Sequence, residues 1–259
     1  TNITSLDDYK NAVDGDTSMV LKVHRANFRM EGFVDSPEVR DLARCDLGDT
    51  LLVSDLGSGN VVRTLGGRPV HEPTPADMIK EGADLVCFSC DKMLGGVQGG
   101  VIAGKAALIQ RLRKNPVMRV VRVDKITYAA LQVVLTYHLA GEHDKVRLWS
   151  LAMAEQEQVR ARVVAFIDQH KLDPNRFTVV DASSTFGGGS TPGDAIPSAA
   201  LRIRTGGSPD EIARFLQELE PPVVGTVNQG SFQIDFRTIV PEDEPDLARA
   251  CNALAIRST

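Results

Sequence analysis

The stretch Ala83-Asp-Leu-Val-Cys-Phe-Ser-Cys-Asp-Lys-Met-Leu-Gly-Gly96 joins an apolar run to an abrupt polar end. The apolar run has the length and composition of a buried strand. Ser89 lies three residues before Lys92, so a tight turn would aim the hydroxyl and the amine at one ligand. The Gly-Gly pair that follows lets backbone N–H groups approach that ligand closely. This stretch therefore predicts a strand that delivers polar side chains to a site.

Lys92 is the candidate reactive group of this stretch. A lysine at the mouth of a buried strand loses hydration, which disfavours the ammonium form and leaves the amine more nucleophilic. A neutral amine is what a Schiff base with an aldehyde cofactor requires. The alternative is a solvated surface lysine, as most lysines after strands are. A second segment favours the reactive amine.

That segment is Leu51-Leu-Val-Ser-Asp-Leu-Gly-Ser-Gly59, another apolar strand, which ends in an aspartate and a glycine-rich loop. In parallel sheets, ligands gather at the carboxyl ends of the strands. An aspartate there can pair with a protonated pyridine nitrogen, while a lysine from a nearby strand holds an aldehyde carbon. Pyridoxal 5'-phosphate (PLP) requires both contacts. Asp55 and Lys92 therefore predict a PLP site.

Four motifs, in this order, resemble the bacterial selenocysteine synthases, the L-seryl-tRNA(Sec) selenium transferase family. They are Lys22-Val-His-Arg-Ala-Asn-Phe-Arg-Met-Glu-Gly-Phe33, Asp55-Leu-Gly-Ser-Gly59, Phe88-Ser-Cys-Asp-Lys-Met-Leu-Gly-Gly-Val-Gln-Gly-Gly100 and Arg119-Val-Val-Arg-Val-Asp-Lys125. The similarity extends from about the first residue to near Leu254. Family members are far longer at the N-terminus, where they carry a small tRNA-binding domain. The resemblance therefore identifies this chain as a C-terminal part that lacks the N-terminal region.

The resemblance implies an α/β fold of the PLP-dependent aspartate-aminotransferase-like class, fold type I. Residues 1–125 would form the C-terminal portion of the PLP-binding large domain, with a mostly parallel sheet. Residues 126–171 would form linking helices, and 172–259 a small C-terminal α+β domain. The implied reaction is the PLP-dependent conversion of L-seryl-tRNA(Sec) to L-selenocysteinyl-tRNA(Sec), with selenophosphate as donor, in selenoprotein biosynthesis. The implied partners are seryl-tRNA(Sec), selenophosphate and further copies of the chain, as homodimers assembled into a larger ring.

The resemblance also assigns roles to individual residues. Lys92 is the catalytic residue, which holds the aldehyde and removes the substrate's α-proton. Asp55 keeps the pyridine nitrogen protonated, and Ser89 contacts the cofactor phosphate. The loop after the strand 19–23 lies at the mouth of the site, which places His24 at the cofactor and Asn27 at the substrate. The alternative for His24 is a hydrogen bond that merely caps its strand.

Arg119 and Arg122 are the candidate anion-binding residues. They belong to a basic run over 105–125, whose first part, to Lys114, is typical of a solvated helix face. The two arginines follow Pro116 and lie among valines, where an exposed arginine would be poorly placed. Guanidinium groups bind phosphate-like anions in a bidentate manner. The resemblance assigns them the oxyanion of the selenium donor.

Two other functions remain open at this point. Relatives of the family are PLP-dependent ammonia lyases that act on phosphorylated amino sugars or other small amines. The missing N-terminal region also allows a catalytically inert fragment that only associates with other copies. The absence of a PLP absorbance band would favour the inert fragment, whereas the Arg-x-x-Arg pair favours the selenium enzyme over a lyase.

The composition is that of a globular protein: 42% of the 259 residues are hydrophobic and 24% are charged, with a formal net charge of −5. This charge does not indicate nucleic-acid binding over the whole surface, so tRNA would need a local basic patch or another domain. Cys87 and Cys90 form a C-x-x-C pair, but no second pair exists, so no metal site is expected. No signal peptide or membrane span is visible, and we expect a cytoplasmic protein without membrane contact.

Periodicity predicts strands alternating with helices up to residue 104 and a mixed α/β pattern after residue 172. We expect a helix that begins at Ser36, a buried helix over 126–139 and one long amphipathic helix over 144–171. Further strands are expected over 19–23, 100–104, 177–180, 199–203, 223–227 and 232–236. Further helices are expected over 75–82, 209–219 and 245–254.

Overall fold

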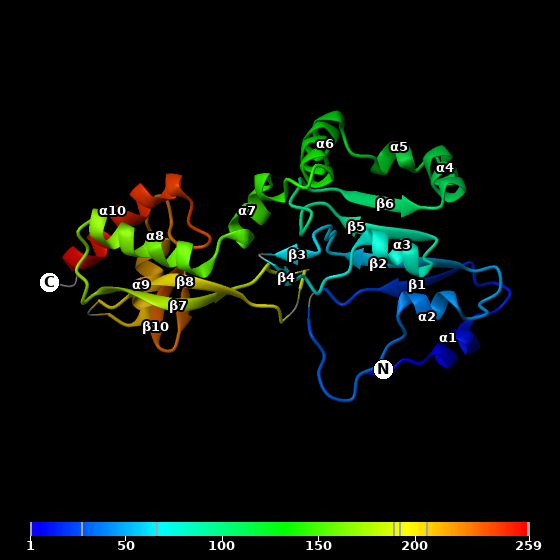
Figure 1. Ribbon diagram of the computed structural model, residues 1–259, viewed down its shortest axis with the longest axis horizontal. Helices are drawn as coiled ribbons and strands as arrows, with labels where there is room; N and C mark the ends of the chain where they lie inside the picture. The colour runs from blue at the N-terminus through cyan, green and yellow to red at the C-terminus, as the bar shows by residue number, and fades with distance from the viewer. Residues whose placement is uncertain are drawn as a thin grey trace. The chain divides into compact units, whose positions relative to one another are not determined.

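Figure 1 shows the computed structural model, which describes residues 2–26, 28–65, 67–188, 190–191, 193–205 and 207–257. The chain forms two compact units. Unit 1 comprises Thr1–Ser150 and Phe186–Asp194, and unit 2 comprises Leu151–Thr185 and Ala195–Thr259. The division expected at residues 125 and 171 follows the family architecture and stays a prediction.

Unit 1 is built on a four-stranded sheet with the order β1-β2-β5-β6. Its strands are β1 (Met19–Val23), β2 (Leu51–Gly57), β5 (Leu85–Ser89) and β6 (Gly100–Gly104). β1, β2 and β5 are parallel, and β6 runs antiparallel to β5. The expected mostly parallel sheet is confirmed, and the carboxyl ends of three strands meet at one edge (Figure 1).

Helices α2 (Val39–Ala43) and α3 (Pro75–Glu81) pack against one face of this sheet. The hydroxyl of Thr74 accepts the N–H of Asp77, whose carboxylate accepts the N–H of Thr74, so a capping box begins α3. Strand residues on the helix-covered face are buried, while their neighbours along each strand point to the opposite face. Four apolar residues on that opposite face are exposed in the described chain: Met19, Leu21, Val23 and Ile102.

The start expected for α2 is wrong. The helix begins at Val39, and Glu38 is its N-cap, in a capping box with Asp41. The hydroxyl of Ser36 accepts a hydrogen bond from the ammonium of Lys22 instead. The Asp41 carboxylate, which accepts the N–H of Glu38, thus replaces the serine and proline that the sequence pattern favours at a helix start.

Three helices follow β6: α4 (Ala106–Lys114), α5 (Met118–Val121) and α6 (Lys125–Leu139). The helix expected over 126–139 exists, but the expectation that it is buried is wrong. Within α6 only Leu131 is buried, while Ile126 is 77% and Leu139 is 89% exposed. The physical reason is that α6 packs along one strip, where Leu131 belongs to a small cluster with Cys90 and Leu94.

The single helix expected over 144–171 is also wrong. The structure has a 3-10 turn (His143–Lys145), α7 (Arg147–Met153) and α8 (Gln156–Gln169). Glu155 takes an extended backbone conformation and forms a capping box with Gln158, so a new helix starts there. Amphipathic periodicity continues through this break, which explains why it was not visible in the sequence.

Unit 2 is an antiparallel sheet with the order β7-β8-β10-β9, against which helices pack. The expected α+β character of this part is therefore confirmed. Its strands are β7 (Phe177–Ser184), β8 (Ile196–Ile203), β9 (Thr226–Asn228) and β10 (Ser231–Asp235), and its remaining helices are α9 (Pro209–Gln217) and α10 (Glu244–Arg257). Unit 2 also contains a 3-10 turn (Pro241–Asp243). Three short elements of unit 1 complete the description: α1 (Leu6–Ala12), β3 (Thr64–Leu65) and β4 (Arg68–Pro69).

Arg237 holds unit 2 together from within. Its side chain is buried, and one guanidinium nitrogen donates to the carbonyls of Leu151, Ala152 and Ala154 at 2.7, 3.2 and 2.7 Å. The second donates to the carbonyl of Pro197 at 2.6 Å. The cation therefore satisfies carbonyl groups left open where α7 ends.

We expect Arg237→Ala to destabilise the chain by about 3 kcal/mol, because several buried carbonyls lose their donor and a cavity remains. The measurement is urea unfolding followed by circular dichroism. The matched control is Arg204→Ala, since Arg204 is exposed in the same unit and should cost less than about 0.5 kcal/mol. Equal effects of the two substitutions would contradict the role of Arg237.

Candidate active site

The loop after β5 that carries Lys92 is fixed by backbone hydrogen bonds. The N–H of Cys90 donates to Gly99 O at 2.9 Å, and the N–H of Gly96 donates back to Cys90 O at 2.8 Å. The N–H of Met93 donates at 2.9 Å to the carbonyl of Ser58, which follows β2. The loop is therefore joined both to β6 and to the segment after β2.

Two ring N–H groups bind carbonyls of the same loop. The indole Nε1 of Trp149, a fully buried side chain, donates to Met93 O at 2.8 Å. The imidazole Nε2 of His138, on α6, lies 2.9 Å from Leu94 O and donates to it. Helices α6 and α7 therefore hold the loop from outside the sheet.

The amine of Lys92 lies at the end of β2. Gly57 has a φ of +75°, and a Cβ placed there would lie 3.9 Å from Lys92 Nζ and 3.8 Å from Ala26 Cβ. Gly57 comes two residues after Asp55 on the same strand. The structure thus brings the lysine amine and the strand that carries Asp55 to one edge of the sheet.

Asp55 lies opposite Cys87 in the parallel register of β2 and β5. Burial, with the neighbouring Asp55 carboxylate as the next cause, raises the pKa of the Cys87 thiol. Cys87 is therefore a protonated neighbour of this carboxylate at neutral pH. All four cysteines are free, and the described residues contain no group of three or more His, Cys, Asp or Glu that could hold a metal ion.

Ser89 ends β5, where the loop after β2 touches it. Gly59 has a φ of +66°, and a Cβ there would stand 2.3 Å from Ser89 O, closer than any side chain can approach. Only glycine combines this backbone conformation with this contact. The position of Ser89 therefore depends on Gly59.

His24 follows β1 directly. Its N–H donates to Asp55 O at 2.8 Å, and its Nε2 lies 3.2 Å from an oxygen of Glu72. Sequence analysis missed Glu72, because nothing in the sequence pairs it with a histidine 48 residues away. The amide of Asn60 donates to the backbone carbonyl of Glu72 at 2.7 Å.

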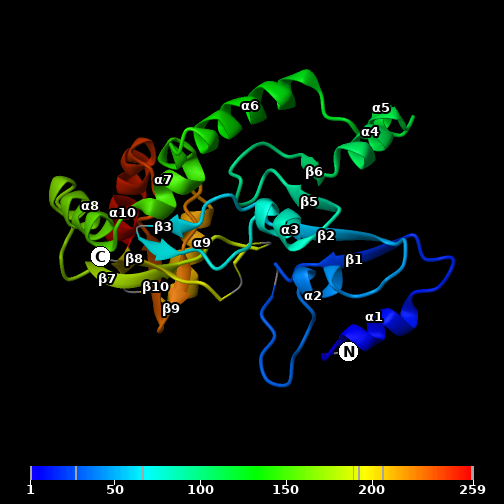
Figure 2. The ribbon, with the colours of Figure 1, turned by 45° about the vertical axis from the view of Figure 1, so that its right-hand side comes forward.

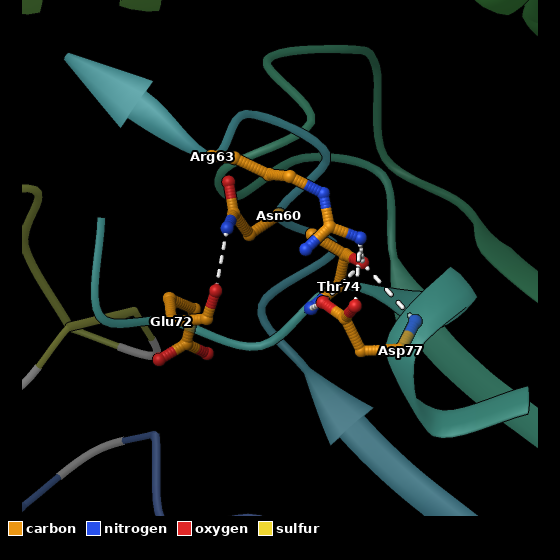
Figure 3. A network of polar contacts seen from close by, with 5 residues as sticks. All are labelled: Asn60, Arg63, Glu72, Thr74 and Asp77. Carbon is orange, nitrogen blue, oxygen red and sulfur yellow. Dashed lines mark hydrogen bonds and ion pairs between the residues drawn. The ribbon is translucent and has the colours of Figure 1, made fainter. Parts of the chain in front are cut away.

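Figure 3 shows a network of polar contacts that includes Glu72. Glu72, Arg63, Thr74 and Asp77 line a cleft of about 470 Å³. Arg63 donates to Asp77 at 2.6 Å and to the Thr74 hydroxyl at 3.4 Å, which joins the loop after β2 to the start of α3. Lys22 also lines the cleft, and burial lowers the pKa of its amine. The cleft thus has both cationic and acidic walls.

Arg119 and Arg122 are not brought to the end of the sheet where Lys92 lies (Figures 1 and 2). Arg119 and Arg122 are exposed, as are Val120 and Val121, so the expectation of a poorly placed exposed arginine is wrong. Figures 1 and 2 both place α5 beside α4, toward the end of the sheet where β1 and β2 begin. Asn27 lies outside the described residues.

The comparisons with known proteins show the family to which this chain belongs. Residues 1–240 match the family model described as L-seryl-tRNA selenium transferase. The chain belongs to the L-seryl-tRNA selenium transferase family. An L-seryl-tRNA(Sec) selenium transferase of Hyphomonas neptunium is 36% identical over 99% of this chain, and one of Solidesulfovibrio magneticus is 38% identical over 97%. The chain spans 57% and 56% of the lengths of these two relatives.

The fold of this family member also occurs in a solved structure of D-glucosaminate-6-phosphate ammonia-lyase. The TM-score is 0.63 at 16% sequence identity, and the match covers 99% of this chain and 62% of the other. The expected fold class is therefore confirmed. Within the described part of the chain, none of the helices has the length and apolar character needed to cross a membrane.

We expect Gly59→Ala to destabilise this family member more than Gly67→Ala does. Both glycines have positive φ angles, but a Cβ at Gly67 meets nothing within 4 Å. Gly67→Ala should therefore cost only about 1–2 kcal/mol of backbone strain, and Gly59→Ala about 1–3 kcal/mol more from the clash with Ser89. Denaturant unfolding measures both values, and equal losses would show that the loop relaxes freely.

Burial lowers the pKa of the His138 imidazole; the hydrogen bond to Leu94 opposes this, and the neighbouring His143 adds to it. The unfolded chain therefore binds this proton more readily than the folded chain does. Above about pH 6.5, the usual imidazole pKa, His138 is neutral in both states and does not lower the free energy of unfolding. As the pH falls below that value, the free energy of unfolding decreases.

We expect His138→Gln to reduce the loss of stability between pH 7.5 and 5.5, measured by urea unfolding at each pH. The exposed His71 provides the control, and His71→Gln should keep the full loss. The same pH dependence in both variants would contradict the assignment to His138.

Proposed function

We propose that this chain forms part of the active site of a PLP-dependent L-seryl-tRNA(Sec) selenium transferase. The observation that carries this proposal is the approach of Lys92 Nζ to Gly57, two residues beyond Asp55. The Asp55 carboxylate, the Ser89 hydroxyl and the Lys92 amine belong to residues at or just beyond the carboxyl ends of two neighbouring parallel strands. This donor set fits the aldehyde, the pyridine nitrogen and the phosphate of PLP.

Each residue of the set has a distinct task in this proposal. Lys92 binds the aldehyde carbon through its amine and later accepts the α-proton of the seryl substrate. Asp55 holds a proton at the pyridine nitrogen, and Ser89 donates to the phosphate. When bound, PLP withdraws electrons from the bonds around the substrate's α-carbon. The Lys92 loop, tied to β6 and to α6 and α7, keeps the amine in place while its proton moves.

Arg119 and Arg122 bind selenophosphate in this proposal. Both are exposed, Arg119 on α5 and Arg122 directly after it, away from the end of the sheet that carries Lys92 (Figures 1 and 2). They would therefore serve the site of a second copy of the chain rather than their own. This fits the expected homodimers that assemble into a larger ring, with active sites at dimer interfaces. Asn27 contacts the seryl-tRNA substrate, whose tRNA body binds mainly to the region outside this chain.

A second candidate is a PLP-dependent ammonia lyase of a phosphorylated amino sugar or small amine. The shared fold with D-glucosaminate-6-phosphate ammonia-lyase favours it as the alternative. Both enzymes place PLP on Lys92, so the substrate separates them. The family membership favours the selenium transferase.

The test adds PLP to the folded chain, records the absorbance spectrum, reduces with borohydride and maps the labelled peptide. We expect a new band and a label on Lys92, and we expect Lys92→Arg to lose both. Lys105→Arg should keep both, because Lys105 is exposed and ion-paired with Asp84. A folded chain without a band or a label on Lys92 would fit the inert fragment and contradict the proposed site.

A further inference from the structure

Glu72 is a buried carboxylate with one side-chain partner. Its side chain is 3% exposed, and one carboxylate oxygen lies 3.2 Å from His24 Nε2. Its other oxygen has no hydrogen-bond partner among the described residues. A buried carboxylate is costly unless it is paired. The imidazole of His24 is therefore the side-chain partner that stabilises this buried carboxylate.

The backbone around Glu72 is fixed without help from its carboxylate. Asn60, which is fully buried, donates to the backbone carbonyl of Glu72 and accepts the N–H of Val62. The start of α3 is capped by Thr74 and Asp77. Figure 3 shows the amide of Asn60 directed at this backbone carbonyl rather than at the carboxylate. A purely structural role therefore leaves the buried charge unexplained.

His24 lies beside the proposed PLP site. Its N–H donates to Asp55 O, and Ala26, two residues further on, approaches Gly57 from one side while Lys92 Nζ approaches the same glycine. The side chain of His24 is 32% exposed and lines the cleft, so its ring is accessible from solvent. If Nε2–H donates to Glu72, the lone pair of Nδ1 is left to accept a proton.

We propose that Glu72 is a positioning residue, which holds His24 as the acid–base group for carbonyl chemistry at Lys92. This inference rests on the proposed function. When the Lys92 amine adds to an aldehyde carbon, a C–N bond forms and the nitrogen must lose a proton. His24 Nδ1 takes that proton and gives it to the aldehyde oxygen, which becomes a hydroxyl group. The nitrogen then loses its second proton to Nδ1, which passes it to the hydroxyl, so that the C=N bond forms as the C–O bond breaks and water leaves. Glu72 stabilises the imidazolium that exists each time Nδ1 holds the proton.

The first test observes the dyad itself, independently of PLP. In the ¹⁵N-labelled chain, His24 should give a downfield, slowly exchanging Nε2–H proton resonance, assigned by its loss in His24→Gln. Glu72→Gln should shift the resonance upfield or abolish it, while Glu81→Gln leaves it unchanged. Glu81 is the matched control because it lines the same cleft. A resonance that is absent from the folded chain, or unaltered in Glu72→Gln, overturns the dyad.

The second test separates rate from affinity. With PLP at saturating concentration, Glu72→Gln should slow the formation of the borohydride-trapped label on Lys92 by about tenfold or more, since acid–base groups typically contribute about 10²–10⁴ in rate. The final extent of labelling and the PLP affinity should stay as in the unaltered chain, and Glu72→Asp should recover part of the rate. A substitution that only loosened the fold would lower affinity as well.

The outcomes distinguish this inference from the proposed function. A labelled Lys92 with equal rates in Glu72→Gln and Glu81→Gln overturns the acid–base role and leaves the proposed function intact. An absence of label on Lys92 in the unaltered, folded chain overturns both. An equal loss of affinity and rate in Glu72→Gln assigns Glu72 to the structure of the cleft and also overturns the inference.

Discussion

The parallel pairing of β2 with β5 is the constraint on which the rest of the site depends. It aligns Val53 with Leu85 and Asp55 with Cys87, and the register then shifts between Asp55 and Gly57. The residue between them, Leu56, is fully buried in the core. Irregularities of this kind redirect the chain next to functional groups. Here the chain turns so that Gly57 faces Lys92, which lies in the loop after the neighbouring strand β5.

Close backbone contacts and ring hydrogen bonds then fix what the strand pairing has brought together. Gly59 allows the loop after β2 to pack directly against Ser89, and the N–H of Met93 donates to the carbonyl of Ser58. Trp149 and His138 bind the next two carbonyls of the Lys92 loop from α7 and α6. The loop that carries Lys92 is therefore held at several independent points. The amine can move mainly by rotation of the Lys92 side chain.

The parts of the fold that the sequence predicted are those in which one local pattern decides the outcome. Apolar strands with abrupt polar ends identified β2 and β5, and the alternation of strands with helices identified α3. The exposure of α6 could not be predicted in this way, because an apolar helix that is exposed has the same composition as one that is buried. The break between α7 and α8 at Glu155 could not be predicted, because a capping box can interrupt a helix without changing the periodicity of its apolar residues.

The candidate site divides along the same line. Asp55 lies near the end of β2, Ser89 ends β5 and Lys92 follows β5, so the parallel topology puts all three at the same end of the sheet. Arg119 and Arg122 were assigned from their apolar neighbours, and those neighbours turned out to be exposed as well. The pairing of His24 with Glu72 depends on a loop that returns to the sheet after many residues. Contacts of that range leave no trace in the local sequence.

The position of Trp149 makes the Lys92 loop optically visible. The chain contains one tryptophan, and its indole is fully buried and bonded to the carbonyl next to Lys92. Its emission wavelength responds to solvent and to hydrogen bonding at this carbonyl, with no competing indole elsewhere in the chain. Opening or closing of the loop would therefore appear as a shift in intrinsic fluorescence, without any attached dye.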